Sequence, residues 1–137
     1  MAITRSLGLD VGDRRIGAAL SDPEGILASP LTIIERSDDR AALAAIIDII
    51  NTNQVGQIIV GLPLSRDGSI GQQAEKVMAF ARELGKHTDV SMDFRDEILS
   101  TVEANRLMRE TGKGKRKGHD DDIAAAVILQ GYLEEGR

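Results

Sequence analysis

The chain has no cysteine and no tryptophan, and only one tyrosine and two phenylalanines among its 137 residues. Without cysteine it can form neither disulfides nor thiolate metal sites. So few aromatic rings argue against a surface that binds single strands by stacking their bases. The basic and apolar segments of a signal peptide are also missing, as is any apolar run long enough to span a membrane. We therefore expect a cytoplasmic protein with an aliphatic core and no membrane partner.

An excess of positive charge is also missing, because the net charge is −5 at pH 7. This value alone would argue against a nucleic-acid partner. The charges are segregated, however: GKGKRKG at 112–118 is strongly basic, and HDDD at 119–122 is acidic. A basic loop beside an acidic pocket is compatible with a polyanionic substrate and a metal site, whatever the net charge.

The order of apolar runs predicts an α/β domain. Runs at 5–11, 16–20 and 30–35, separated by turn signals, predict a meander of three strands. Helices and strands then alternate, with strands expected at 57–63 and 89–97 and helices at 38–50, 72–84, about 100–110 and about 120–134. No linker or repeat divides the chain. We therefore expect one domain over residues 1–137, a mixed five-stranded sheet flanked by helices.

Two local details can be predicted within this outline. The helix at 38–50 should begin at Ser37 or Asp38, whose side chains suit an N-cap. The segment DVSMDFRDE alternates apolar and polar residues, which predicts that Val90, Met92 and Phe94 are buried while the other side of the strand faces water.

Acidic residues stand where several predicted elements begin or end. Asp10 closes the first strand, Asp96 and Glu97 close the last, and three aspartates at 120–122 open the last helix. If the first and last strands are neighbours, these carboxylates meet. Converging carboxylates repel one another and require a hard cation such as Mg²⁺ or Mn²⁺. Such a site activates a water for in-line displacement at phosphorus.

Each acidic position also has a simpler explanation. Asp10 could cap the GDRR turn, Glu97 could be an ordinary surface acid, and the aspartates at 120–122 could favour the positive end of a helix dipole. Helical spacing does not choose among these three aspartates, because the predicted helix is apolar most of the way round. The basic loop could be merely solvated. The joint placement of the acids at element ends is what favours a metal site.

Four segments carry a resemblance to a known family. LGLDVGDRRIGAALSD, IIVGLPLSRDGS, DEILSTVEA and KGHDDDIAAAVILQGYL resemble, in order and spacing, the YqgF-like (RuvX) family. Its members are described as pre-16S rRNA processing nucleases and as Holliday junction resolvase homologues. The resemblance covers nearly the whole chain, and it implies an RNase H-like fold and a divalent-metal nuclease.

The resemblance also assigns site residues. It places the family's three acids on Asp10, Glu97 and Asp121, which we expect to bind Mg²⁺ or Mn²⁺ and to be catalytic. Gly12 is expected to allow a close approach of backbone or substrate. Contacts to the nucleic-acid backbone are expected from Arg15, Lys113, Lys115, Arg116 and Lys117.

Two positions depart from the family's pattern. Ile98 stands where the family usually has arginine, which leaves substrate handling open. Asp120 occupies a place that is usually apolar, so whether Asp120 or Asp122 adds a ligand also stays open.

The expected function is hydrolysis of phosphodiester bonds by a metal-dependent endonuclease, in maturation of the 5′ end of pre-16S rRNA. One alternative is a Holliday junction resolvase acting on four-way DNA, which would need a two-fold dimer. The sequence shows neither a heptad repeat nor an unexplained aromatic patch that would indicate a dimer interface, so we expect a monomer or weak dimer. Another alternative is a non-catalytic nucleic-acid-binding ribosome-assembly factor. LDVGDRRIGAAL also resembles the first phosphate loop of actin and sugar-kinase ATPases, but those enzymes need two such lobes.

Overall fold

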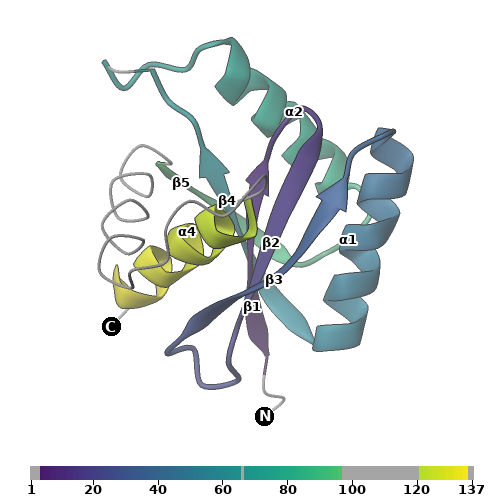
Figure 1. Cartoon of the computed structure of the whole chain (residues 1–137), viewed down its shortest axis with the longest axis vertical. Coiled ribbons are helices and arrows are strands. Elements are labelled where there is room, and N and C mark those ends of the chain that lie inside the picture. Colours follow the sequence, from purple (N-terminus) through teal and green to yellow (C-terminus); the bar gives the residue numbers. More distant parts are fainter. Residues whose placement is uncertain (1–3, 66, 97–120, 136–137) are drawn as a thin grey trace.

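The computed structural model describes residues 4–65, 67–96 and 121–135, which contain five strands and three helices (Figure 1). In chain order they are β1 (Arg5–Val11), β2 (Arg15–Ser21), β3 (Ala28–Glu35), α1 (Asp39–Asn53), β4 (Val55–Leu62), α2 (Gln72–Gly85), β5 (Ser91–Asp96) and α4 (Asp121–Glu135). The helix predicted at about 100–110 lies outside the described residues. No helix in the described ranges has the length and apolar character needed to cross a bilayer.

The strands form one mixed sheet in the order β3-β2-β1-β4-β5. β1, β2 and β3 are the predicted antiparallel meander, while β4 and β5 run parallel to β1. β1 and β4 occupy the centre and are covered on both faces, which explains why their sequences are nearly continuous apolar runs. The prediction of a mixed five-stranded sheet is confirmed.

The first and last of these strands are not neighbours, because β4 lies between them. The condition under which Asp10 and Glu97 would meet across adjacent strands is therefore not fulfilled. β1, β4 and β5 are parallel, however, so their carboxyl ends share one edge of the sheet. The register pairs Leu9 with Val60 and Val60 with Phe94, which puts β1 and β5 level there. One intervening strand separates them by about 10 Å.

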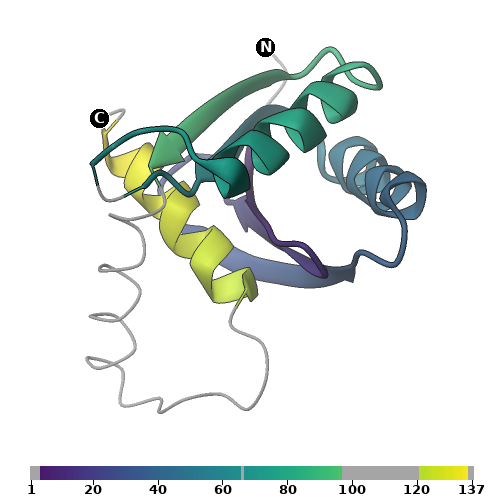
Figure 2. The same cartoon turned by 90° about the horizontal axis from the view of Figure 1, so that it is seen from above.

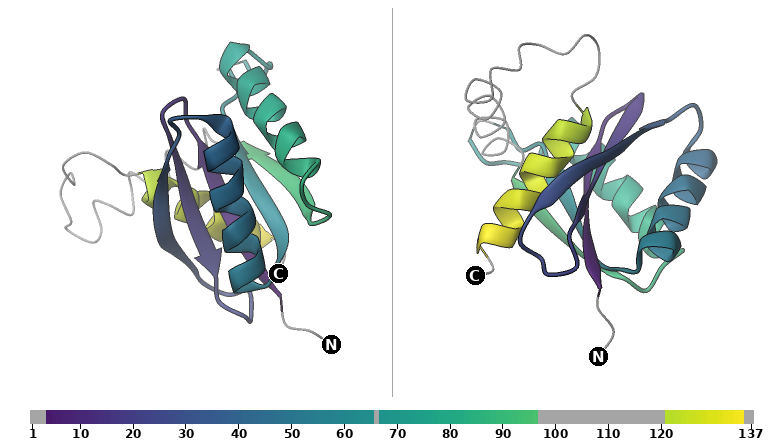
Figure 3. Two further views of the ribbon diagram at one scale, coloured as in Figure 1. Left: turned by 90° about the vertical axis from the view of Figure 1, so that its right-hand side faces the viewer. Right: turned by 60° about the horizontal axis from the view of Figure 1, so that its bottom comes forward.

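Helices cover both faces of the sheet, with α1 and α2 on one face and α4 on the other (Figures 2 and 3). The face under α1 and α2 is filled by large aliphatic side chains. Its fully buried members include Leu7, Leu9, Ile16, Ile46 and Ile58. Burial of each such side chain contributes about 1.5–3 kcal/mol, so this layer is the main apolar core.

The face under α4 combines large and small buried residues. Its cluster contains Ile59, Ile128, Leu129 and Leu133 together with Ala19, Ala125 and Ala126. A Cβ on Gly8 would lie 2.8 Å from the carbonyl oxygen of Ala125 and 2.8 Å from the Cβ of Leu129. The backbone of α4 therefore rests almost directly on β1, an approach that a side chain at Gly8 would prevent.

Gln130 fastens the middle of α4 to the β2–β3 hairpin. Its Oε1 accepts a hydrogen bond from the backbone N–H of Ala28 at 2.8 Å, and its Nε2 donates to the carbonyl oxygen of Ile26 at 2.9 Å. Ala28 and Gln130 are 102 positions apart in the chain, so this pair of bonds joins distant segments.

The two local predictions had different outcomes. Asp38 caps α1, since the N–H of Ala41 donates to its carboxylate at 2.7 Å. The predicted burial of Phe94 is wrong, because that residue is 43% exposed. β5 lies at the edge of the described sheet, where Phe94 is incompletely covered. On the opposite side of β5, Arg95 is largely buried instead, because its guanidinium lies against Gly131, which has no side chain in the way.

Candidate metal centre at the sheet edge

Asp10 lies near the end of β1 and is half-buried. Its neighbours Leu9 and Val11 belong to the core under α1 and α2. Successive side chains of a strand point to opposite faces, so Asp10 lies on the face that α4 covers. Its cross-strand partner in β2 is Gly17. The carboxylate thus stands at the carboxyl end of a central strand, beside a residue without a side chain.

Asp121 approaches the same place from α4. It is the first residue of that helix, and its carbonyl oxygen would overlap any Cβ added to Gly17. Asp10 and Asp121 therefore flank Gly17, one within the sheet and one above it. The structure thus places both predicted site residues next to Gly17. The role of Gly17 was missed from the sequence; glycine inside a strand, a usual mark of close backbone approach, was the available signal.

Arg15, the first residue of β2, pairs with Asp121. Its Nε is 3.4 Å from a carboxylate oxygen of Asp121, and both side chains are 35% exposed. An ion pair so accessible to water contributes about 0–1 kcal/mol to stability. The guanidinium is therefore held at the site loosely and stays accessible to an anionic ligand.

Two further acids lie near the edge. Asp122 is half-buried and accepts a hydrogen bond from the N–H of Ile123 at 2.9 Å. That bond engages one of the free N–H groups at the start of α4. Asp96, the last residue of β5, is also half-buried. Asp122 follows Asp121 in the sequence, and Asp96 ends a strand at the same edge of the sheet, so both acids add negative charge near the site.

The remaining predicted site residues fall outside the ranges that the structure describes. They are Glu97, Ile98, Lys113, Lys115, Arg116, Lys117 and Asp120. Within residues 4–65, 67–96 and 121–135, no three histidine or acidic side chains gather closely enough to hold a metal ion. Asp10 and Asp121 supply hard oxygen donors from two elements, a donor set that suits Mg²⁺ or Mn²⁺ once a third carboxylate joins them.

The turn between β1 and β2 is tightly held. The N–H of Gly12 donates to the carbonyl oxygen of Arg15 at 2.9 Å, and a Cβ on Gly12 would lie 2.8 Å from that oxygen. The prediction that Gly12 permits a close backbone approach is confirmed. On its other side, the carbonyl oxygen of Gly12 accepts a hydrogen bond from Nη1 of Arg36 at 2.8 Å.

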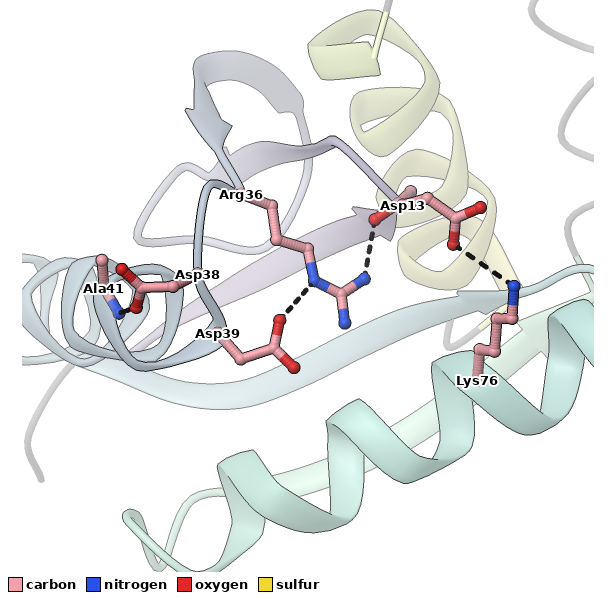
Figure 4. A network of polar contacts seen from close by, with 7 residues as sticks. Asp13, Arg36, Asp38, Asp39, Ala41 and Lys76 are labelled. Carbon is pink, nitrogen blue, oxygen red and sulfur yellow. Dashed lines mark hydrogen bonds and ion pairs between the residues drawn. The ribbon is translucent and has the colours of Figure 1, made fainter.

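A separate groove of about 1270 Å³ lies between α1 and α2, on the opposite face of the sheet from Asp10. Its lining includes Asp13, Arg36 and Lys76. As Figure 4 shows, Lys76 pairs with Asp13 of the β1–β2 turn, and Arg36 bonds both to that turn and to the start of α1. Its charges are of both signs, so it offers no strong field to a polyanion. The groove was not predicted from the sequence.

Comparison with known proteins adds to this geometry. The sequence matches the family described as "RuvX: Holliday junction resolvase" over residues 4–135. The chain belongs to the RuvX family. Relatives carrying the name "Putative pre-16S rRNA nuclease" include one from Dehalococcoides mccartyi, 49% identical over 91% of this chain and 94% of its own length. Another, from Desulforamulus reducens, is 43% identical over 96% and 98%.

Solved structures similar to this RuvX-family chain include two complexes with Holliday junctions. RuvC of T. thermophilus in complex with a Holliday junction substrate has a TM-score of 0.63 at 12% identity, covering 97% of this chain and 95% of that one. The fowlpox virus resolvase in complex with Holliday junction DNA has a TM-score of 0.57 at 14% identity, covering 96% and 98%. At these identities the likeness shows the fold, which is RNase H-like, as the sequence motifs implied.

Proposed function

We propose that the chain is a divalent-metal-dependent endonuclease that hydrolyses phosphodiester bonds during maturation of the 5′ end of pre-16S rRNA. The observation that supports the proposal is that Asp10 and Asp121 both adjoin Gly17, at the carboxyl end of the central strand. The family membership and the names of the close relatives point to the same class of reaction.

In this proposal Asp10, Asp121 and Glu97 hold Mg²⁺ or Mn²⁺ through carboxylate oxygens. The bound cation supplies activation of a water and neutralisation of charge at the scissile phosphate. Gly17 keeps the space between strand and helix small enough for Asp10 and Asp121 to act on one ion. Arg15 exchanges its partner Asp121 for a phosphate oxygen of the substrate.

Binding of the nucleic-acid backbone is assigned to Arg15 together with Lys113, Lys115, Arg116 and Lys117. Lysine and arginine contacts to phosphates give affinity without reading sequence, so this set would accept RNA or DNA. The choice of RNA rests on the names of the relatives. The family's description and the likeness to RuvC favour a second candidate, cleavage of four-way DNA junctions.

A cleavage assay tests the proposal. A pre-16S leader RNA and a four-way DNA junction are each incubated with Mg²⁺, Mn²⁺ or EDTA. The variants are Asp10→Asn and, as matched control, Asp13→Asn, which removes the same charge three residues on, from a 61% exposed side chain paired with Lys76. We expect metal-dependent cutting of the RNA, lost in Asp10→Asn and kept in Asp13→Asn.

Other outcomes would redirect or end the proposal. Paired cuts in the junction alone would make the protein a resolvase. No cutting of either substrate, with Asp10→Asn binding RNA as well as wild type, would leave a non-catalytic binding factor as the better explanation.

A further inference from the structure

Arg36 follows β3 and contacts three parts of the fold: α1 and the β1–β2 turn, which Figure 4 shows, and α2. Its side chain is only 14% exposed. Nε donates to the carboxylate of Asp39 at 2.8 Å, and the guanidinium lies 4.8 Å from the centre of the Phe80 ring. These contacts, from the first residue of α1 and from α2, fix the plane of the guanidinium.

The fixed guanidinium in turn holds the β1–β2 turn. Nη1 donates to the carbonyl oxygen of Gly12 at 2.8 Å, and the backbone N–H of Arg36 donates to the carbonyl oxygen of Arg14 at 2.8 Å. Arg36 therefore holds the turn by hydrogen bonds to the carbonyl oxygens of both Gly12 and Arg14. Hydrogen bonds from a charged donor are roughly twice as strong as neutral ones, so the side-chain contact is a firm anchor.

We propose that Arg36 is a positioning residue for the metal centre: by holding the Gly12 carbonyl it fixes the turn that sets Asp10 and Arg15 in place. That this centre binds a metal rests on the proposed function. The effect of Arg36 on the position of the turn does not depend on it. Asp10 lies two residues before Gly12, and Arg15 follows the same turn. The last rungs of the hairpin pair Asp10 with Gly17 and Val11 with Ile16. Loss of the hydrogen bond from Arg36 to Gly12 therefore displaces the turn and, with it, these last paired residues.

A second ion pair on the same turn provides the contrast. Nζ of Lys76 lies 4.0 Å from a carboxylate oxygen of Asp13, and the two side chains are 59% and 61% exposed. Exposed pairs at such a distance constrain little. Lys76→Met therefore removes a cation of α2 that contacts the same turn and lines the same groove, without removing the anchor. Arg36→Lys keeps the charge of Arg36 but cannot span Gly12 and Asp39 together, because lysine lacks the planar fork of donors.

The experiment combines NMR with metal binding, on the full chain, in wild type, Arg36→Lys and Lys76→Met. The first readout is the resonance of the Asp10 carboxyl carbon and the backbone amides of the β1–β2 turn, without metal. The second is the affinity for Mn²⁺, measured by calorimetry. Chemical unfolding confirms that each variant is folded under the conditions used.

In Arg36→Lys we expect the Asp10 and turn resonances to shift and the Mn²⁺ affinity to fall about tenfold, as is typical when a residue supporting a metal ligand is lost. In Lys76→Met the Asp10 carboxyl resonance should stay in place and the affinity should stay within about twofold. An unchanged Asp10 resonance in folded Arg36→Lys would overturn the inference. If wild type binds no Mn²⁺, the metal centre fails, and the Asp10 resonance alone decides the role of Arg36.

Discussion

The helices on the two faces of the sheet pack against the strands in different ways. Under α1 and α2 the space is filled by large aliphatic side chains, so the helices stand away from the strands by the width of a side-chain layer. Under α4 large side chains such as Ile128 and Leu129 are buried as well, but glycines in β1 and β2 let the helix backbone lie directly against the strands. The two faces therefore differ in how closely a helix backbone approaches the strands.

This difference suggests that one face chiefly determines the stability of the fold and the other the geometry of the candidate metal site. The aliphatic layer can lose a methyl group and relax without moving Asp10, which lies on the other face. The face under α4 holds the contact between Asp121 and Gly17, the cross-strand partner of Asp10. Substitutions in the aliphatic core and at the α4 contact, the Arg36 anchor apart, should therefore have separable effects on folding and on metal binding, and the following predictions test that separation.

The largest effect on stability is expected from Ile46→Ala. Ile46 in α1 is fully buried in the aliphatic layer. Its truncation should lower the free energy of unfolding by about 2–5 kcal/mol, measured by chemical denaturation. The Mn²⁺ affinity of the folded protein should stay within about twofold. A parallel loss of affinity would show that the two faces are coupled. Ile47→Ala, at a partly buried position of the same helix, is the control and should cost less.

Metal binding should itself stabilise the fold. At 100 times its dissociation constant, Mn²⁺ should raise the free energy of unfolding by about 2.7 kcal/mol, because it binds only the folded chain. Excess EDTA should remove the gain, and Asp10→Asn should abolish it. Equal stabilisation of wild type and Asp10→Asn would place the cation somewhere else on the molecule.

Gly17→Ala should reverse the pattern of Ile46→Ala. The added methyl group would overlap the carbonyl oxygen of Asp121, so α4 must shift outwards. We expect a loss of about 1–3 kcal/mol in stability and a fall of more than tenfold in Mn²⁺ affinity. Gly85→Ala is the matched control, since its Cβ would meet only the flexible tip of Met92, at 3.2 Å. Unchanged Mn²⁺ affinity in folded Gly17→Ala would contradict the role given to this contact.

The smallest effect concerns the pair between Arg36 and Asp39. The hydrogen bond from Arg36, aided by its charge, lowers the pKa of Asp39 below the ordinary value of 3.8. A carboxyl group with a lowered pKa stabilises the fold above its unfolded pKa, and this stability is lost as pH falls through the folded value. Because Asp39 is 62% exposed, the contribution at pH 7 should be at most about 1 kcal/mol.

A comparison of wild type with Asp39→Asn checks this pH dependence. The difference in their free energies of unfolding should be constant from pH 7 to about 5 and should shrink below the ordinary aspartate pKa. A difference that does not change with pH would assign the effect to the start of α1 rather than to the charge.

Much of the fold could be predicted from local patterns. Apolar runs and turn signals located the strands, and the cap at Asp38 fell on one of two proposed residues. The place of β4 between β1 and β5 could not be predicted, because each strand's own sequence is compatible with either neighbour. The exposure of Phe94 was missed for a similar reason, since alternation reports the side of a strand but not whether anything covers it.

The candidate site divides in the same way. Asp10 and Asp121 could be assigned to one edge from their positions at element ends and from the family motifs. The contact that joins them could not, because Gly17 meets a helix that lies over 100 positions later in the chain, and no local pattern records that docking. Arg36 was missed because its partner Gly12 lies 24 positions away.

The bonds from Gln130 to the β2–β3 hairpin have a consequence for the order in which the protein folds. They close a loop of 102 positions, whereas the meander and the neighbouring helices form through much shorter loops. Loop-closure entropy delays such distant contacts, so we expect α4 to dock late. A chain whose meander has already formed would then still keep Asp10 and Asp121 apart, and the proposed metal centre would assemble only as folding ends.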